Sequence, residues 1–188
     1  MKNYLPILLL LLPCFASAQF HLALKNNDVS NALQQVIEDF PNRFNNIRGE
    51  IIGQDVQAVN YTSSVNISDS DSSIIIQNGN DSDNIYSWNE IVFVTDDFDK
   101  AKARFHEYFT KIKNTTVAVS DGKIIFNGDY IEPDEAKQFT TILFAGKPEV
   151  QELKDVMIDL SLHYVVDGWQ VSISVYEHKD YGVDNANN

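Results

Sequence analysis

Hydrophobic residues recur at the spacing of an α-helix near the start of the chain. Asp28 stands where it can cap the N-terminus of such a helix. Pro41 can open a short separate turn through Phe44 and Ile47, because proline is tolerated at a first helical position. The pattern predicts a helix that begins after Asp28 and is interrupted at Pro41. Its apolar stripe consists of Val29, Leu33, Val36, Ile37 and Phe40.

A second stretch has the same periodicity and clearer end signals. Asp97 and two neighbouring carboxylates precede it, and Lys111 and Lys113 lie at its end, so the charges suit the dipole of a helix. Glu107 and Lys111 are four residues apart and are expected to form an ion pair on the outer side. We therefore predict a second helix. Its apolar stripe consists of Phe98, Ala101, Phe105, Phe109 and Ile112.

Most of the remaining chain has the pattern of β-strands. Asp121-Gly122 separates two short apolar runs and is a strong hairpin signal. The longest run, Ile85–Thr95, is apolar on both faces at its end, which predicts a central strand or one covered on both sides. Alternating or apolar runs predict further strands at Val59–Ile67, Ile74–Ile76, Val117–Val119, Ile124–Phe126 and Phe139–Ala145.

The C-terminal part of the chain predicts a β-hairpin. Asp167-Gly168 is expected to form a two-residue turn, which would pair Val166 with Trp169 and place His163 opposite Ser172. Alternation then gives one apolar face, which runs from Ile158 and Leu160 to Val175, and one polar face. This division is typical of an antiparallel sheet with one covered and one solvated side.

The predicted order is a helix followed by about four strands, twice in succession. The segments FPNRFNNI, from Phe40, and FHEYFTKI, from Phe105, place Phe, Phe and Ile at the same spacing. We predict an α+β fold with two helices packed on an antiparallel β-sheet. A tandem repeat of a helix and four strands, with halves 28–95 and 96–177, is one explanation of the shared spacing. The other is that any amphipathic helix places core residues at these intervals.

The N-terminus has the pattern of a secretory signal peptide over residues 1–18. Lys2 is followed by an apolar segment that is well short of the ~20 residues of a membrane span, and Ala16-Ser17-Ala18 predicts cleavage before Gln19. Cys14 leaves a lipoprotein as the alternative, which Pro13 disfavours. A secreted or periplasmic protein is therefore expected, with a single domain over residues 19–180 and a disordered tail over 181–188.

Composition excludes several classes of partner and chemistry. The formal net charge of −13 disfavours nucleic acids and anionic membrane surfaces, because both require clustered Lys and Arg. The single cysteine, Cys14, would be removed with the signal peptide, so neither a disulfide nor a thiol nucleophile is expected. The four N-x-S/T sequons, which begin at Asn60, Asn66, Asn80 and Asn114, matter only in a eukaryotic host.

Candidate catalytic and metal-binding residues are few. Asp159, Ser161 and His163 alternate along one predicted strand, where neighbours two apart are ~7 Å from each other, beyond direct hydrogen bonding. The four histidines form no metal-binding motif. The acidic loops at 69–71 and 80–84 lack the spacing of an EF-hand, which favours polar hairpin loops and leaves calcium binding as the alternative. We predict no metal and no cofactor.

Two stretches resemble a family of small secreted bacterial proteins of unknown function. They are FPNRFNNIRGE and the pair IYSW and DDFDKAKARFHEYF, which together span Phe40 to Phe109. The resemblance implies an exported or periplasmic bacterial protein, and it assigns no catalytic residues. The order of helices and strands is also similar to that of a secreted β-lactamase inhibitor protein, as an analogy of fold alone.

These observations favour an exported, non-enzymatic binding or interaction module with an unknown protein or small-molecule partner. Four aromatic residues are expected on an outer face of the sheet and are the candidates for ligand contact: Tyr61, Tyr86, Trp88 and Tyr176. The alternative is a small secreted hydrolase that uses carboxylates and His163 in a cleft. A deep pocket with converging titratable groups would favour the enzyme, and a filled core with a flat sheet would favour the module.

Overall fold

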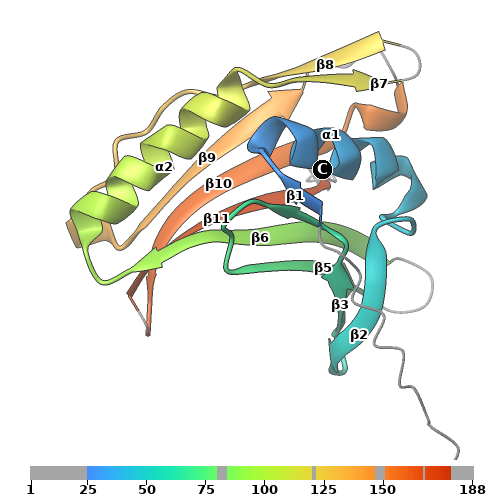
Figure 1. Cartoon of the computed structure of the whole chain (residues 1–188), viewed down its shortest axis with the longest axis horizontal. Coiled ribbons are helices and arrows are strands. Elements are labelled where there is room, and N and C mark those ends of the chain that lie inside the picture. The colour runs from blue at the N-terminus through green and yellow to red at the C-terminus, as the bar shows by residue number, and fades with distance from the viewer. Residues whose placement is uncertain (1–24, 80–83, 120–121, 147–150, 167, 179–188) are drawn as a thin grey trace, which may run out of the picture.

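The computed structural model describes residues 25–79, 84–119, 122–146, 151–166 and 168–178 (Figure 1). The predicted signal peptide, the tail that is predicted to be disordered, Cys14 and most of the second acidic loop lie outside these residues. The fold is α+β, with two α-helices and a large antiparallel sheet, as predicted.

The main sheet has nine strands in the order β2-β3-β5-β6-β11-β10-β9-β8-β7, and every neighbouring pair is antiparallel. The strand predicted over Ile85–Thr95 is β6, an interior strand that is fourth in the order, between β5 and β11. The strands are β2 (Arg48–Gln54), β3 (Ala58–Ser63), β5 (Ser72–Asn78), β6 (Ile85–Thr95), β7 (Thr116–Val119), β8 (Gly122–Asn127), β9 (Phe139–Gly146), β10 (Val156–Val165) and β11 (Gly168–Glu177).

Two further strands, β1 (Lys25–Asn27) and β4 (Val65–Ile67), form a small parallel sheet. Helices α1 (Val29–Asp39) and α2 (Phe98–Lys113) lie with this small sheet on one side of the nine strands (Figure 1). The 3-10 helices are η1 (Phe40–Asn42), η2 (Glu135–Lys137) and η3 (Gln151–Leu153). We call the side with the helices the inner face and the opposite side the outer face.

Helix α2 covers the centre of the inner face. It packs on β6, β8, β10 and β11, and it buries Phe105 and Ile112 completely. Phe109, on the same stripe, is also buried. Asp97 caps the helix, because its carboxylate accepts a hydrogen bond from the backbone N–H of Lys100 at 3.1 Å. The stripe read from the sequence is therefore the core-facing side of this helix.

Helix α1 departs from the prediction that both helices pack on the sheet in the same way. The neighbours against which it packs are β4, β7 and α2, so it lies beside a strand of the other half. Leu33 and Ile37 are fully buried there. The correction has a physical reason: the small β1–β4 sheet covers the first-half strands at this point, and Trp88 and Glu90 on β6 bond to β4 instead.

The turn after α1 is organised by a buried carboxylate. Asp39 accepts hydrogen bonds from the backbone N–H of Asn46 at 2.8 Å and from the Asn42 amide at 3.0 Å. Arg43 and Phe44 both have positive φ, which is uncommon for residues other than glycine, and the Phe44 side chain is fully buried. The predicted interruption at Pro41 is confirmed, since η1 begins at Phe40.

The two edges of the nine-stranded sheet differ. At β7, the backbone N–H of Ala118 donates to Gln34 Oε1 of α1 at 2.8 Å, and Gln34 Nε2 donates back to the Ala118 carbonyl. At β2, Ile51 and Ile52 are 57% and 56% exposed, and pairing with β3 shifts register twice. Bulges of this kind are a common way of protecting an edge strand.

The C-terminal hairpin has the predicted faces but a different register. Val165 pairs with Gly168 and Tyr164 with Trp169, so the predicted pairing of Val166 with Trp169 is wrong by two residues. His163 is opposite Gln170, and not Ser172. The reason lies in packing: the Trp169 ring contacts the Phe98 ring of α2 at 4.8 Å between centroids, which fixes where β11 begins.

Gly168 is required by this packing. Its φ is +123°, and a Cβ at this position would lie 2.5 Å from the Thr95 carbonyl oxygen. We expect Gly168→Ala to lower the free energy of unfolding by ~1–3 kcal/mol, measured by urea denaturation. Gly53→Ala on β2 is the matched control, because its nearest neighbour is an ordinary contact at 3.5 Å. Equal stability of the two variants would contradict the described hairpin.

Candidate functional site

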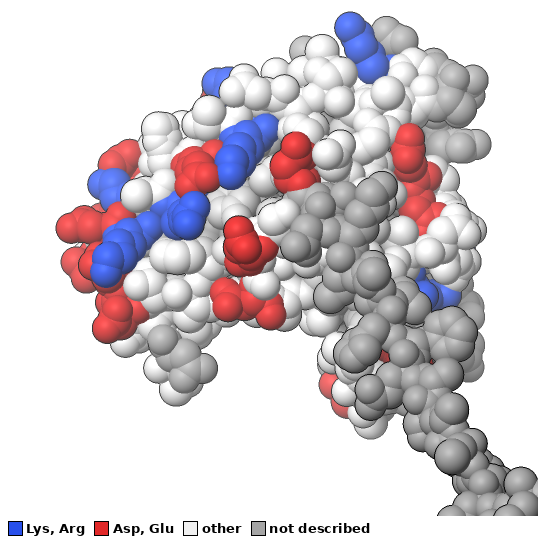
Figure 2. Space-filling view, viewed as in Figure 1, with Lys and Arg blue, Asp and Glu red and all other residues white. Residues whose placement is uncertain are grey.

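The outer face of the nine-stranded sheet is covered by neither α1 nor α2 nor the small parallel sheet (Figure 1). Seen from the side in Figure 2, the molecule is hollowed below β5 and β6, between the ends of β10 and β11 and the β2–β3 hairpin. The pairing of the five strands β5, β6, β11, β10 and β9 places outward residues in three rows. The rows are Ser72–Ile91–Ser172–Ser161–Thr141, Ile74–Asn89–Ser174–Asp159–Leu143 and Ile76–Ser87–Tyr176–Met157–Ala145.

These rows contain almost no charge. Asp159 is the one ionisable acid or base with a formal charge among the fifteen positions. Charged residues make up 22% of the chain, so about three would be expected by composition alone. Aliphatic, hydroxyl and amide side chains occupy the rest. A solvated sheet face in an acidic protein has no evident need to exclude charge, whereas the centre of a binding interface does.

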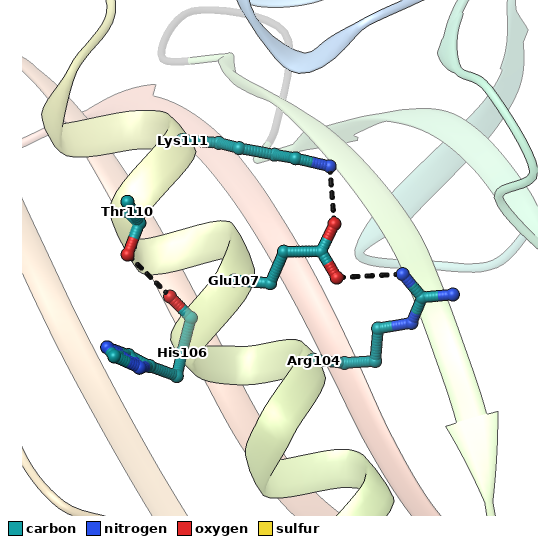
Figure 3. A network of polar contacts seen from close by, with 5 residues as sticks. All are labelled: Arg104, His106, Glu107, Thr110 and Lys111. Carbon is teal, nitrogen blue, oxygen red and sulfur yellow. Dashed lines mark hydrogen bonds and ion pairs between the residues drawn. The ribbon is translucent and has the colours of Figure 1, made fainter.

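The exposed side of α2 is a contrast on the same molecule. Glu107 pairs with Lys111 at 2.6 Å, as predicted, and with Arg104 at 2.8 Å, as Figure 3 shows. Lys111 and then Arg104 lower the pKa of the Glu107 carboxyl. Lys and Arg alternate with Asp and Glu over this part of the surface in Figure 2. The helix side is thus an ordinary charged surface, and the uncharged rows are particular to the outer face.

Short hydrogen bonds hold the polar side chains of the outer face in place. Ser174 Oγ donates to Asn89 Oδ1 at 2.7 Å, and Asn89 Nδ2 donates to Ser87 Oγ at 2.8 Å. The hydroxyls of Thr141 and Ser161 are 2.9 Å apart. Bonds of this kind, within β6 and between neighbouring strands, restrict rotamers, so that the surface is preorganised before any partner arrives.

Two titratable side chains on β10 are perturbed by their position. Burial raises the pKa of Asp159 to about 6 and lowers the pKa of His163. Asp159 Oδ1 and His163 Nδ1 are both buried atoms without a hydrogen-bond partner in the described part of the chain. Burial and then the nearby Asp159 carboxyl raise the pKa of Tyr176. The one acidic side chain in the three rows is therefore neutralised more easily than an ordinary aspartate.

The arrangement does not bring together the residues of the predicted alternative, a hydrolase. Ser161 is hydrogen-bonded to Thr141, and among the described residues no hydrogen bond joins it to His163 or joins His163 to Asp159. His106, on α2, lies against the Tyr130 ring at 4.9 Å. No group of three or more His, Cys, Asp or Glu in the described part of the chain is placed to hold a metal ion.

The four aromatic contact candidates lie in three different environments. Tyr176 is on the outer face, as expected. Trp88 is fully buried in the core, and its Nε1 donates to Ser63 Oγ at 3.2 Å, so the expectation of an outer position is corrected. Tyr61 and Tyr86 are also on the inner face, where their rings flank the Arg48 guanidinium at 4.9 and 5.0 Å.

The reason for this correction is the alternation of β6. Trp88 pairs with Ile75 and Val175, which are both buried, so every second residue on either side of it points inward. The residues that the sequence reasoning missed are Ile74, Ile76, Asn89 and Ile91, which point outward. Only Ile74 and Ile76 had a local signal, because in the run Ile74–Ile76 the middle residue must face one side of the sheet and its two neighbours the other.

A second buried acid lies on the inner face of β6. Glu90 is fully buried, and its Oε1 accepts a hydrogen bond from the backbone N–H of Ile67 on β4 at 2.9 Å. Burial raises the pKa of its carboxyl to about 7, against the opposing effect of the Ser70 and Ser73 hydroxyls. Because Glu90 holds β4 on the sheet and does not reach the outer face, its role here is structural.

Comparisons with known proteins give no family for this chain: no protein-family model, no curated protein and no solved structure matches it. Among the described residues, no helix is both long enough and apolar enough to cross a membrane. The outer face of the sheet and the N-terminal sequence are therefore the features from which function is inferred.

Proposed function

We propose that this protein is an exported, non-enzymatic binding module that holds a partner protein on the outer face of its nine-stranded sheet. The observation that carries the proposal is the absence of charge over the three rows, Asp159 excepted. Export rests on the N-terminal pattern of Lys2, an apolar segment and Ala16-Ser17-Ala18.

The size of the outer face suits a protein better than a small molecule. Five strands ~4.8 Å apart, with about eight residues each at ~3.4 Å, cover roughly 650 Å² in projection. A standard protein–protein interface buries ~800 Å² on each partner, and accessible area exceeds projected area. Phe139 and Leu143 on β9 are 59% and 52% exposed, so apolar area is already accessible at the border of the rows.

Two pairs of matched substitutions test the proposal. Leu143→Lys places a charge on the outer face, and Ile131→Lys places the same charge at a similarly exposed residue, 51% against 52%. Ile131 is next to Glu132, which pairs with Lys102 of α2, so it lies on the helix side. The wild-type chain should capture a protein from an extract of its source organism. We expect the Leu143→Lys variant to fail to capture that protein and the Ile131→Lys variant to capture it as the wild type does.

Loss of capture in both lysine variants, or in neither, would contradict a binding surface on the outer face. The hydrolase alternative makes a different prediction, since it requires His163. His163→Ala should then abolish a hydrolytic activity of the purified chain, while Phe139→Ala, beside it on the same face, should not. A hydrolytic activity lost in this way would replace the binding module by an enzyme.

We also infer that the two halves of the sheet derive from one duplicated unit. In the first half, α1 precedes the meander β2-β3-β5-β6, and in the second, α2 precedes a meander that ends in β8-β9-β10-β11. The last strands of the two meanders, β6 and β11, pair antiparallel at the centre. Residues 28–95 should superpose on residues 96–177 with the helix and at least three strands in the same order.

A further inference from the structure

The outer face contains a hollow of about 200 Å³ on the β5 side of the proposed binding surface. It lies over β5, β6 and β11, and the three strands contribute different chemistry to it. Strands β5 and β6 supply branched aliphatic side chains, and β6 and β11 supply amide and hydroxyl groups. The lining includes Ile74 and Ile76 of β5, Asn89 and Ile91 of β6, and Ser172 and Ser174 of β11.

The polar groups of the hollow already have partners, yet they retain bonding capacity. Asn89 Oδ1 accepts from Ser174, and one Asn89 N–H is used by Ser87. An amide has two N–H donors and a carbonyl with two lone pairs, so one donor and one acceptor site remain at Asn89. The Asn89 amide therefore lies in the same hollow as the aliphatic side chains of Ile74, Ile76 and Ile91. A ligand with an apolar ring and one hydroxyl group matches this arrangement.

The size of the hollow limits what can enter it. An apolar cavity of ~150 Å³ in a protein accommodates a benzene molecule, so the hollow is large enough for one ring with a small substituent. It is too small for a nucleotide or a disaccharide, because ligand sites of drug size occupy ~300–1,000 Å³. Aromatic side chains are also the residues most enriched at the centre of protein interfaces.

We infer that this hollow receives one aromatic side chain, a tyrosine, from the partner protein. The inference rests on the proposed function, which it deepens by naming the group that the partner must present. The ring would pack on Ile74, Ile76 and Ile91, and the hydroxyl would bond with the amide of Asn89. Glu90 is the one residue with an ionisable side chain among the described residues that line the hollow, and its carboxylate is bonded to Ile67 on the inner face. The remaining lining is uncharged, which suits a neutral phenol and gives no attraction to Lys, Arg or an anion.

The test uses p-cresol, the side-chain analogue of tyrosine, titrated into the full ¹⁵N-labelled mature chain. We expect saturable amide shift changes centred on Ile74, Asn89 and Ser172. The saturated analogue 4-methylcyclohexanol should bind more weakly, because it loses the ring contacts. Absence of saturable shifts, or equal binding of the saturated analogue, would overturn the assignment of an aromatic side chain.

A matched pair of variants locates the site. Ser172→Phe fills the hollow and should weaken p-cresol binding at least about tenfold. Ser161→Phe is the control, because it makes the same change in the same row, one strand further along and outside the hollow. The dispersion of each variant's own amide spectrum checks that it is folded. Equal loss in the two variants would overturn the location.

The outcomes separate this inference from the proposed function. Capture that is lost in Leu143→Lys, together with no binding of p-cresol, would leave the binding module and overturn the aromatic site. Binding of p-cresol that is lost in Ser172→Phe, together with capture unchanged in both Leu143→Lys and Ser172→Phe, would support the site and overturn the binding of a partner protein at this face.

Discussion

Replacing Phe105 with alanine should lower the free energy of unfolding by about 3–5 kcal/mol. The Phe105 side chain is fully buried between α2 and the sheet, with the Tyr130 ring 6.3 Å away between centroids. The substitution removes a ring and leaves a cavity that close-packed neighbours fill only in part. Since small domains are stable by ~5–15 kcal/mol, the variant would be close to unfolding at room temperature.

Phe139→Ala provides the control for this prediction. It removes the same atoms from β9, where the ring is 59% exposed, so the loss should be well under that of Phe105→Ala. Phe44→Ala should behave like Phe105→Ala, because Phe44 is equally buried. The free energies of unfolding of the wild type and the three variants, measured by urea denaturation, test these predictions. Similar losses in Phe105→Ala and Phe139→Ala would contradict the packing of α2 on the inner face.

Glu90→Gln should make the protein more stable near neutral pH and leave its stability almost unchanged in acid. The folded-state pKa of Glu90 is raised from 4.5 to about 7. Below pH 4.5 the carboxyl is protonated in both the folded and the unfolded state, so it imposes no penalty. As the pH rises from 4.5 to 7 the unfolded state loses its proton first, and stability falls.

The size of this effect follows from the pKa difference. A raised pKa of this extent corresponds to about 3 kcal/mol of lost stability above pH 7, and glutamine, which cannot ionise, avoids that loss. Glutamine keeps the Oε1 acceptor for the Ile67 N–H. The difference in unfolding free energy between variant and wild type should therefore rise from near zero at about pH 4 to about 3 kcal/mol at about pH 8.

Glu107→Gln is the control with the opposite sign. The Glu107 pKa is lowered by Lys111 and Arg104, so its contribution to stability is present above its unfolded pKa and is lost as the pH falls through the folded pKa. Glu107→Gln should lower the free energy of unfolding at about pH 7 and leave it unchanged in acid. A Glu90→Gln difference that stays constant between about pH 4 and about pH 8 would contradict an ionisable carboxyl buried in the core.

Local signals predicted the elements well where each element depends on its own residues. The run Ile85–Thr95 is β6 to the residue, and the stripe of α2 is buried as the spacing indicated. The faces of β10 and β11 were also predicted, because alternation survives a shift of two residues. The register itself depends on how Trp169 meets Phe98 and how Gly168 meets Thr95, which are contacts between segments far apart in the chain.

The site was predicted less well than the fold for a related reason. Which parity of β6 faces the helices is decided by β4, whose Val65 carbonyl accepts the Trp88 N–H at 3.3 Å. The local pattern of β6 does not indicate that β4 packs on it, so Tyr86 and Trp88 were assigned to the wrong face. Asp39 and Glu90 are likewise acids by sequence and core residues by structure, because each carboxylate accepts a hydrogen bond from a backbone N–H outside its own helix or strand.

The unequal edges of the sheet determine how many molecules could ever join edge to edge. Gln34 already occupies both outer hydrogen-bonding groups of Ala118, and the bulges of β2 interrupt the regular ladder that a further strand would need. Each edge of the sheet therefore has its own barrier to strand addition. Removing the side chain of Gln34 would lift the barrier at β7 alone. Two molecules could then meet at that edge, but a fibre, which needs two available edges on each molecule, could not grow.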